Sequence, residues 1–179
     1  MDRISSRRNN IVAAFRTAAA GQHGLLLLDG KHLVEEAVRA SLSIKTLAMT
    51  TSRLADNKLL AESLANVGTK VMSVTESVMD AISPVVTPSG IVALADRPPV
   101  TVDDLLVRTP QFVVGLVDIQ NPGNLGAVIR TAEAGGATGV AATGQSTDPY
   151  GWKALRGAMG GTFRIPVTWP MASLSLIAD

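Results

Sequence analysis

The chain has 179 residues, of which 46% are hydrophobic, 17% charged and 3% aromatic, with a formal net charge of +1 and no cysteine. This composition excludes a largely disordered protein, disulfides, cysteine–zinc sites and thiolate catalysis. The near-neutral net charge gives no overall electrostatic attraction for nucleic acid. The scarcity of aromatic residues argues against recognition of RNA by base stacking. The longest apolar runs are strand-sized and no signal peptide is visible, so we expect a cytoplasmic protein without membrane contact.

The first 96 residues alternate between helical and extended patterns. A helix is predicted over residues 6–21, with Ser5 or Ser6 as its N-cap. In chain order, the apolar periodicity then predicts strand 24–30, helix 31–41, strand 44–50, helix 57–68, strand 70–75, helix 76–83 capped by Thr75, and strand 89–96. This alternation indicates a small α/β unit with its own sheet.

Two consecutive prolines, Pro98 and Pro99, interrupt this pattern because proline continues neither a helix nor a central strand. We therefore expect a first domain over residues 1–97, a linker over 98–110 that contains a short helix capped by Thr101, and a second domain over 111–179. In the second domain, strand 111–119, helix 125–134 and strand 139–144 form a βαβ pattern. Such a pattern predicts a parallel sheet whose sites lie at the carboxyl ends of its strands.

The turn inside that βαβ pattern is Asn-Pro-Gly-Asn, residues 121–124. Pro122 fixes φ, Gly123 tolerates positive φ, and Asn124 can cap a helix that starts at Leu125. The pair Gly135–Gly136 is typical of a helix C-terminus. These features are structural, and they match neither the G-x-G-x-x-G fingerprint of dinucleotide binding nor a P-loop.

Arg130 is not explained by the turn. It lies one turn after Gly126, on a helix face with almost no side chain near the loop. Its guanidinium could fold back toward a ligand at the strand ends, or it could form an i,i+3 surface ion pair with Glu133. The spacing favours neither alternative.

Residues 121–140 (NPGNLGAVIRTAEAGGATGV) resemble the first signature motif of the SpoU (TrmH-type) RNA 2′-O-ribose methyltransferases, which belong to the knotted SPOUT class. Residues 26–40 and 86–96 resemble the start and the end of that family's substrate-binding domain. Residues 148–167 resemble the segment after the second strand of the catalytic domain. The resemblance implies an α/β protein with a small ribosomal-protein-like substrate-binding domain, followed by an incomplete SPOUT domain, which is a knotted Rossmann-like domain with a parallel sheet.

The resemblance implies methyl transfer from S-adenosylmethionine to a ribose 2′-hydroxyl of ribosomal or transfer RNA, with ribosomal RNA favoured, by a homodimer that needs no metal. Asn124 and Arg130 match the family's catalytic positions beside the target ribose. An arginine is normally protonated, so we expect it to hold the ribose–phosphate and stabilise developing negative charge. Further substrate-binding candidates are Asn121 and Glu133 in the motif, and Arg7, Arg8, Lys31 and His32 in the first domain. For Glu133, a structural partnership with an arginine is favoured over a part in the chemistry.

Structural alternatives remain open for several of these residues. The basic start of the chain could be a solvated helix surface, and His32 could be an exposed histidine without a role. The two histidines, His23 and His32, are too few for a histidine-rich metal centre. Residues 156–161 (RGAMGG) could be a close-packed helix whose small residues admit a neighbouring backbone, and Ala158 replaces the family's usual serine. A small α/β metabolic enzyme of another class would need its own catalytic constellation, and the sequence shows none.

The family's second motif, with Gly-x-Glu, and its third motif, with Ile-Pro and then Ser-Leu-Asn, are not found before Asp179. We therefore expect the residues of the S-adenosylmethionine pocket to lie beyond Asp179, and the chain to be a fragment of a longer enzyme. The alternative is a natural truncation, an inactive remnant that binds RNA.

Overall fold

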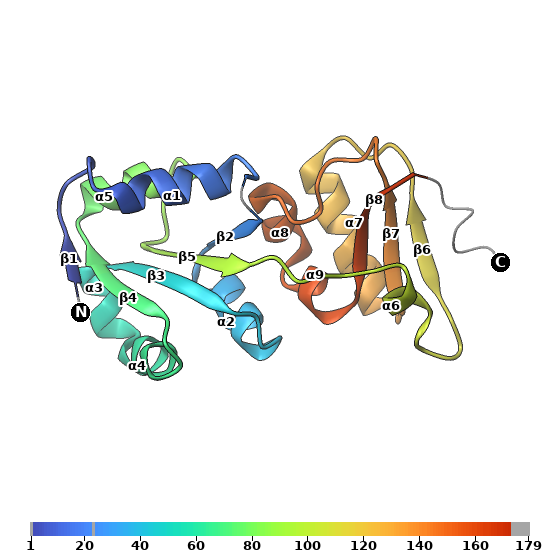
Figure 1. The fold of residues 1–179 in the computed structure, drawn as a ribbon, viewed down its shortest axis with the longest axis horizontal. Coiled ribbons are helices and arrows are strands. Elements are labelled where there is room, and N and C mark those ends of the chain that lie inside the picture. The colour runs from blue at the N-terminus through green and yellow to red at the C-terminus, as the bar shows by residue number, and fades with distance from the viewer. Residues whose placement is uncertain (1, 23, 173–179) are drawn as a thin grey trace. The chain divides into compact units, whose positions relative to one another are not determined.

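The computed structural model describes residues 2–22 and 24–172 (Figure 1). The chain divides into two compact units between Arg97 and Pro98, next to the paired prolines. His23, which was discussed from the sequence, and the last seven residues of the predicted second domain lie outside the described residues. Among the described helices, none combines the length and the apolar character that a membrane span requires.

The first unit is built on a five-stranded mixed sheet with the order β1-β4-β3-β5-β2. Its strands are β1 (Asp2–Ile4), β2 (Leu25–Asp29), β3 (Ile44–Thr50), β4 (Lys70–Val74) and β5 (Ile91–Asp96). Strands β1, β4 and β3 run parallel, whereas β5 is antiparallel to both β3 and β2. Ile91–Ala95 of β5 are all buried, because this strand lies between two neighbours and under helices on both faces.

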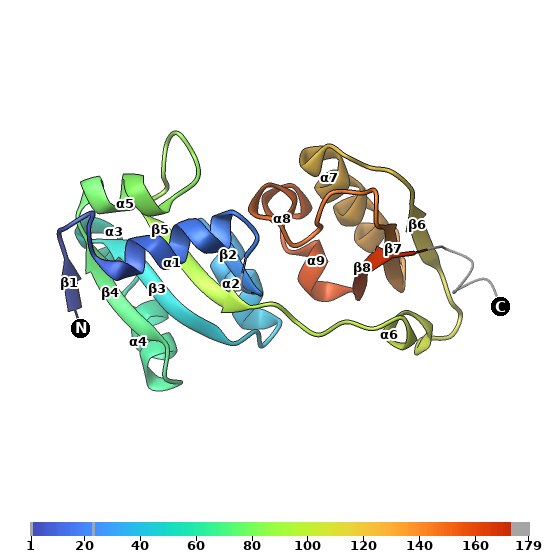
Figure 2. The ribbon, with the colours of Figure 1, turned by 45° about the horizontal axis from the view of Figure 1, so that its top comes forward.

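Helices cover both faces of this sheet. Helices α1 (Asn10–Ala19) and α5 (Glu76–Ile82) lie on one face, and α2 (Lys31–Arg39) and α4 (Lys58–Asn66) lie on the other (Figures 1 and 2). The arginines of the α1 region hold it to α5: Arg7 Nε donates to the Ser77 carbonyl at 2.7 Å and Arg16 Nε to the Ala81 carbonyl at 3.1 Å. The prediction of an α/β fold is confirmed.

The sequence did not indicate two short elements of this unit. Strand β1 has three residues, too few to show a period, and α3 (Thr51–Asp56) follows β3 without a break. The predicted N-cap of α1 was also wrong, because the cap is Asn9, whose Oδ1 accepts from the Ile11 N–H at 3.0 Å, rather than Ser5 or Ser6. Asparagine and serine are equally good caps, so composition alone could not decide between them.

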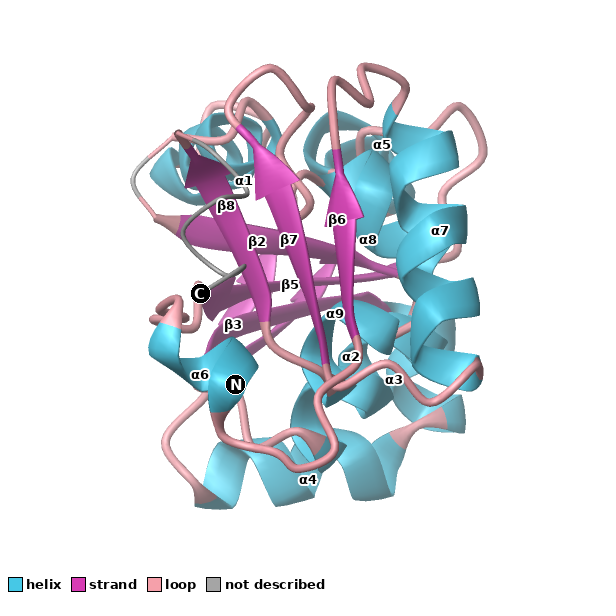
Figure 3. Ribbon diagram, turned by 90° about the vertical axis from the view of Figure 1, so that its right-hand side faces the viewer, coloured by secondary structure: helices cyan, strands magenta, loops and turns pink. Residues whose placement is uncertain are grey.

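The second unit contains a three-stranded sheet, β6 (Val113–Leu116), β7 (Gly139–Thr143) and β8 (Val167–Met171), in that order. All three strands are parallel, as the βαβ pattern predicted (Figure 3). Strand β8 was not predicted, because Pro170 lies within it; among the described strands β8 is at the edge of the sheet, where proline is tolerated. The helices of this unit are α6 (Asp103–Leu106), α7 (Pro122–Ala134), α8 (Trp152–Ala158) and α9 (Gly161–Arg164).

The segment expected to be a linker packs on the second unit. Leu105 of α6 is fully buried against Ala141 and Met171. Thr101 is not the cap of this helix, since its N–H and its hydroxyl both donate to Asp104 Oδ2, at 2.7 and 2.9 Å. These bonds favour the carboxylate and lower the pKa of Asp104. Their contribution to stability is therefore complete above the ordinary carboxyl pKa and is lost as the pH falls through the lowered value.

Candidate active site

The turn after β6 is organised by Asn121 rather than by Asn124. Asn121 is the N-cap of α7, and its Oδ1 accepts from the Asn124 N–H at 3.1 Å. The helix therefore begins at Pro122, three residues earlier than predicted, because proline is pre-organised for the first helical position. The predicted capping role of Asn124 is wrong, and its exposed side chain is left available to a ligand.

The loop between β6 and α7 is fastened to the loop after β7. Asp118, at φ 55°, donates its N–H to Thr143 Oγ1 at 3.2 Å, and the Ile119 N–H donates to Ser146 Oγ at 3.1 Å. The Thr147 N–H returns a bond to the Ile119 carbonyl at 2.8 Å. The carboxyl ends of two parallel strands thus fix the direction in which α7 leaves the sheet, at the edge where parallel sheets carry their sites.

Helix α7 meets α8 through backbone atoms. A Cβ placed on Gly126 would lie 2.3 Å from the Ala154 carbonyl oxygen and 2.8 Å from both the Ala158 nitrogen and the Gly157 Cα. Gly157 in turn lies against the Gly126 Cα. The close packing interpreted for residues 156–161 is confirmed at Gly157 and Gly161, but these residues are not one helix, because α8 ends at Ala158 and Met159 and Gly160 adopt positive φ before α9.

Arg130 lies on the same side of α7 as this contact. Gly126 and Arg130 are one turn apart, and the Cβ position of Gly161 is 3.4 Å from the Arg130 Cα. The Arg130 side chain is exposed and pairs with none of the described residues. Its backbone is therefore held against α8 and α9, while its guanidinium remains available.

Glu133, one further turn along, is bound to α9. Its Oε1 accepts from Arg164 Nε at 3.0 Å and its Oε2 from Arg164 Nη2 at 3.1 Å. The alternative of an Arg130–Glu133 ion pair is therefore wrong, because the carboxylate is occupied by a fork-shaped pair with another arginine. A structural role accounts for Glu133, and its part in substrate binding stays a prediction.

The Glu133–Arg164 pair should contribute measurably to the stability of the second unit. Both tryptophans of the chain, Trp152 and Trp169, lie in this unit, so tryptophan fluorescence in denaturant reports its unfolding. A double-mutant cycle with Glu133→Ala and Arg164→Ala should give a coupling energy of about 0.5–1 kcal/mol, since both groups are partly exposed. A coupling energy of zero, together with weaker RNA binding in Glu133→Ala and unchanged RNA binding in Arg164→Ala, would mean that the carboxylate contacts the substrate instead.

The remaining predicted residues lie in the first unit, at two places: before α1 and at the start of α2. Arg7 is exposed and uses its Nε on the Ser77 carbonyl, while Arg8 is exposed beside it. Lys31 Nζ lies 3.7 Å from Glu35 Oε1, and His32 is exposed at the start of α2.

The sequence did not indicate the role of Arg53, which donates from Nε to the Ser89 carbonyl at 2.9 Å and supports the turn into β5. Among the described residues, no group of three His, Cys, Asp or Glu side chains could hold a metal ion.

Family models match both units. Residues 111–176 match the SpoU rRNA methylase family, and residues 21–93 match the MRM3-like substrate-binding domain. The second unit is thus similar to the SpoU rRNA methylase family, and the first unit to a substrate-binding domain. Since the two matches follow in this order, the recognition made from the motifs is confirmed.

Similar sequences are found among curated proteins. The chain is 32% identical over 170 residues to a tRNA/rRNA methyltransferase of Synechocystis, covering 91% of this chain and 60% of that protein. It is 31% identical over 141 residues to the 23S rRNA (guanosine(2553)-2′-O)-methyltransferase RlmP of Bacillus subtilis, covering 79% and 52%. The chain thus spans about half to three fifths of the length of these relatives.

Solved structures share the fold. The rRNA methyltransferase from Sinorhizobium meliloti superposes with a TM-score of 0.81 at 28% identity, covering 98% of this chain and 67% of that one. The SpoU methyltransferase AviRb from Streptomyces viridochromogenes, in complex with the cofactor AdoMet, gives 0.82 at 25% identity, covering 96% and 66%.

Proposed function

We propose that the protein carrying this chain transfers a methyl group from S-adenosylmethionine to a ribose 2′-hydroxyl of ribosomal RNA. The observation that carries the proposal is the placement of Arg130, which is exposed and unpaired among the described residues, while its backbone is held beside Gly161. Relatives named as rRNA methyltransferases support the reaction class, and RlmP is named as a 2′-O-methyltransferase of 23S rRNA.

The chain's own residues supply the substrate side of this reaction. A ribose hydroxyl is a weak nucleophile that loses its proton as it attacks, so negative charge develops on its oxygen. The fixed positive charge of Arg130 can hold the neighbouring phosphate and stabilise that oxygen. The Asn124 amide, at the exposed start of α7, can hydrogen-bond to the ribose.

The described residues do not fit the cofactor by themselves. The polar groups at the carboxyl ends of β6 and β7 are already bonded within the protein, since Thr143 Oγ1 accepts from the Asp118 N–H and Ser146 Oγ accepts from the Ile119 N–H. We propose S-adenosylmethionine as the methyl donor because similar methyltransferases have been solved with AdoMet bound. We expect the residues that bind it to lie beyond Asp179. That location, like the expectation that the chain is a fragment, stays a prediction.

We assign substrate RNA binding to the first unit, because its residues 21–93 match a substrate-binding domain. Arg7, Arg8, Lys31 and His32 stay the predicted contacts, and ribosomal RNA is preferred over transfer RNA. A homodimer, an absence of metal and a cytoplasmic location are further predictions for the protein that carries the chain.

The decisive experiment incubates that protein with ribosomal RNA and S-adenosylmethionine labelled in its methyl group. A 2′-O-methyl group blocks alkaline cleavage of the adjacent phosphodiester, so we expect the label in alkali-resistant dinucleotides. Label in alkali-sensitive mononucleotides would place the methyl group on a base and contradict the proposal. Salt-dependent RNA binding without any transfer would favour the inactive RNA-binding remnant.

A further inference from the structure

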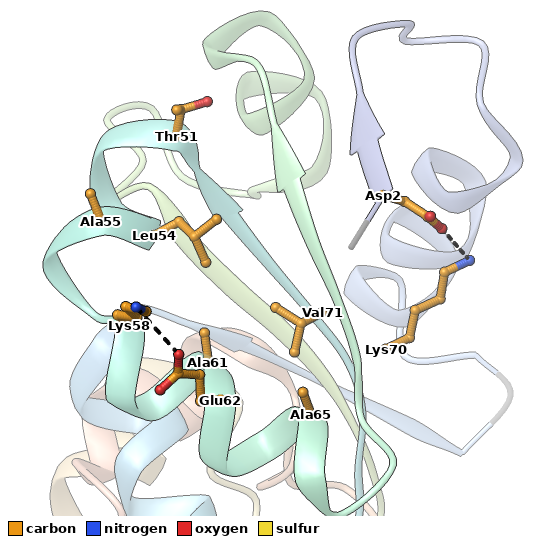
Figure 4. Close-up of a pocket in the computed structure, with 10 residues that line it drawn as sticks. All are labelled: Asp2, Thr51, Leu54, Ala55, Lys58, Ala61, Glu62, Ala65, Lys70 and Val71. Carbon is orange, nitrogen blue, oxygen red and sulfur yellow. Dashed lines mark ion pairs between the residues drawn. The ribbon is translucent and has the colours of Figure 1, made fainter.

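A groove of about 720 Å³ lies in the first unit between α4 and the start of β4 (Figure 4). Leu54, Ala61, Ala65 and Val71 supply its apolar lining. Two ion pairs stand on its rim, Lys58–Glu62 on α4 and Lys70–Asp2 between β4 and β1, each at 3.7 Å. We call this feature the α4 groove. The proposed methyl transfer uses none of its residues.

The rim carries equal numbers of positive and negative groups. A phosphate backbone would meet Asp2 and Glu62 as closely as it would meet the two lysines, and no aromatic side chain lines the groove for base stacking. Both ion pairs are long, and the four side chains are 56–77% exposed, so the charges can exchange partners. These features favour a protein surface with balanced charge over RNA.

Helix α4 also presents an apolar side chain to solvent. Leu59 is 84% exposed, whereas Ala61 and Leu64 of the same helix are buried. Leu59 stands between Lys58 and Glu62 in sequence and lies next to the charged face of the helix. Leu59 therefore adds an exposed apolar group to the helix that borders the groove.

The order of charges along α4 identifies the occupant. Lys58 and Glu62 lie one turn apart on one helix face. When a second copy of α4 lies antiparallel across a two-fold axis that passes at Leu60, Lys58 of each copy faces Glu62 of the other. A two-fold interface requires such a self-complementary surface. The alanines of the groove permit close approach, and Leu59 of each copy would be covered.

We propose that a second copy of this chain docks in the α4 groove, with the two α4 helices antiparallel. This contact belongs to the first unit, so it is distinct from the catalytic-domain dimer that the family resemblance implies. It does not rest on the proposed methyl transfer.

The test uses the 179-residue chain, measured by sedimentation equilibrium over a range of concentrations at low salt. Lys58→Glu and Glu62→Lys each give α4 two like charges, so each variant alone should raise the dimer dissociation constant at least about tenfold. An equimolar mixture of the two variants pairs opposite charges across the axis and should restore the wild-type dissociation constant to within about threefold. Loss of the internal Lys58–Glu62 pair cannot explain such a rescue, because that pair is absent from both variants.

Leu59→Asp should also weaken the dimer, and Val86→Asp is the matched control, because Val86 is a fully exposed apolar residue elsewhere in the first unit. A wild-type chain that stays monomeric, a dimer that ignores the α4 variants, or a mixture that does not recover would each overturn the proposal. The proposal would also be overturned if Lys58→Glu kept the molecular mass of the wild type in sedimentation equilibrium but lost RNA binding. That result would make the groove an RNA-binding surface.

Discussion

Replacing Arg130 with alanine should lower kcat/KM for methyl transfer by about 100–1000-fold, the range found when one charge-stabilising donor is removed from an active site. The fold should be unaffected, since the side chain is exposed and pairs with none of the described residues. We expect the free energy of unfolding to change by less than about 0.5 kcal/mol. Single-turnover methylation of ribosomal RNA, together with tryptophan fluorescence in denaturant, measures both quantities.

Arg108→Ala is the matched control, because it removes another exposed arginine of the second unit that has no partner among the described residues. It should retain turnover. Arg130→Lys keeps the positive charge but loses the planar fork, so it should recover part of the activity. Wild-type turnover in Arg130→Ala would remove the residue from the mechanism, whereas equal losses in both alanine variants would indicate a general effect of surface charge.

Replacing Gly126 with alanine should destabilise the second unit by about 2 kcal/mol. Alanine is the better helix former by about 1 kcal/mol, but its Cβ would stand 2.3 Å from the Ala154 carbonyl oxygen. The atoms in its way are backbone atoms of α8, so the helices must separate, and overpacking of this kind costs about 1–3 kcal/mol. Chemical denaturation followed by tryptophan fluorescence reports this unit alone, because Trp152 and Trp169 both belong to it.

Gly123→Ala is the control for this effect in the same helix. Its Cβ would meet a single side-chain atom, Asn121 Oδ1, at 3.2 Å, so the substitution strains at most the N-cap bond to the Asn124 N–H and no backbone contact with α8. We expect its stability to stay within about 1 kcal/mol of the wild type. Equal losses in the two variants would mean that the helix start, and not the contact with α8, sets the cost.

Most of the elements could be predicted because their apolar periodicity is strong. Helix α2 and strands β3 and β5 are clear in sequence, since one face or both faces of each are buried. Strand β1 and helix α3 were missed because three and six residues are too short to display a period. Strand β8 was missed because its position at one side of the sheet tolerates Pro170.

The candidate site was predictable as a set of residues but not as a geometry. The motif singled out Asn124 and Arg130, yet the spacing left the partner of Arg130 open. The decisive contact comes from Arg164, which lies 31 residues after Glu133 and occupies its carboxylate. No local pattern can reveal such a pairing, because it depends on how α9 packs against α7. The roles of Asn124 and Arg130 in catalysis stay predictions.

The backbone contact between α7 and α8 bears on how much order the molecule must gain in the proposed complex with RNA. Glycine-to-backbone packing leaves no side chains at the Gly126 contact that could change rotamer, and the Arg130 Cα is held beside Gly161. In the proposed complex the conformational entropy lost at this site therefore falls on the exposed side chains of Arg130 and Asn124. Immobilising one such side chain costs about 0.5–1.5 kcal/mol. A closely packed helix pair that carries two exposed side chains can thus adapt to a ribose–phosphate without rearranging its backbone.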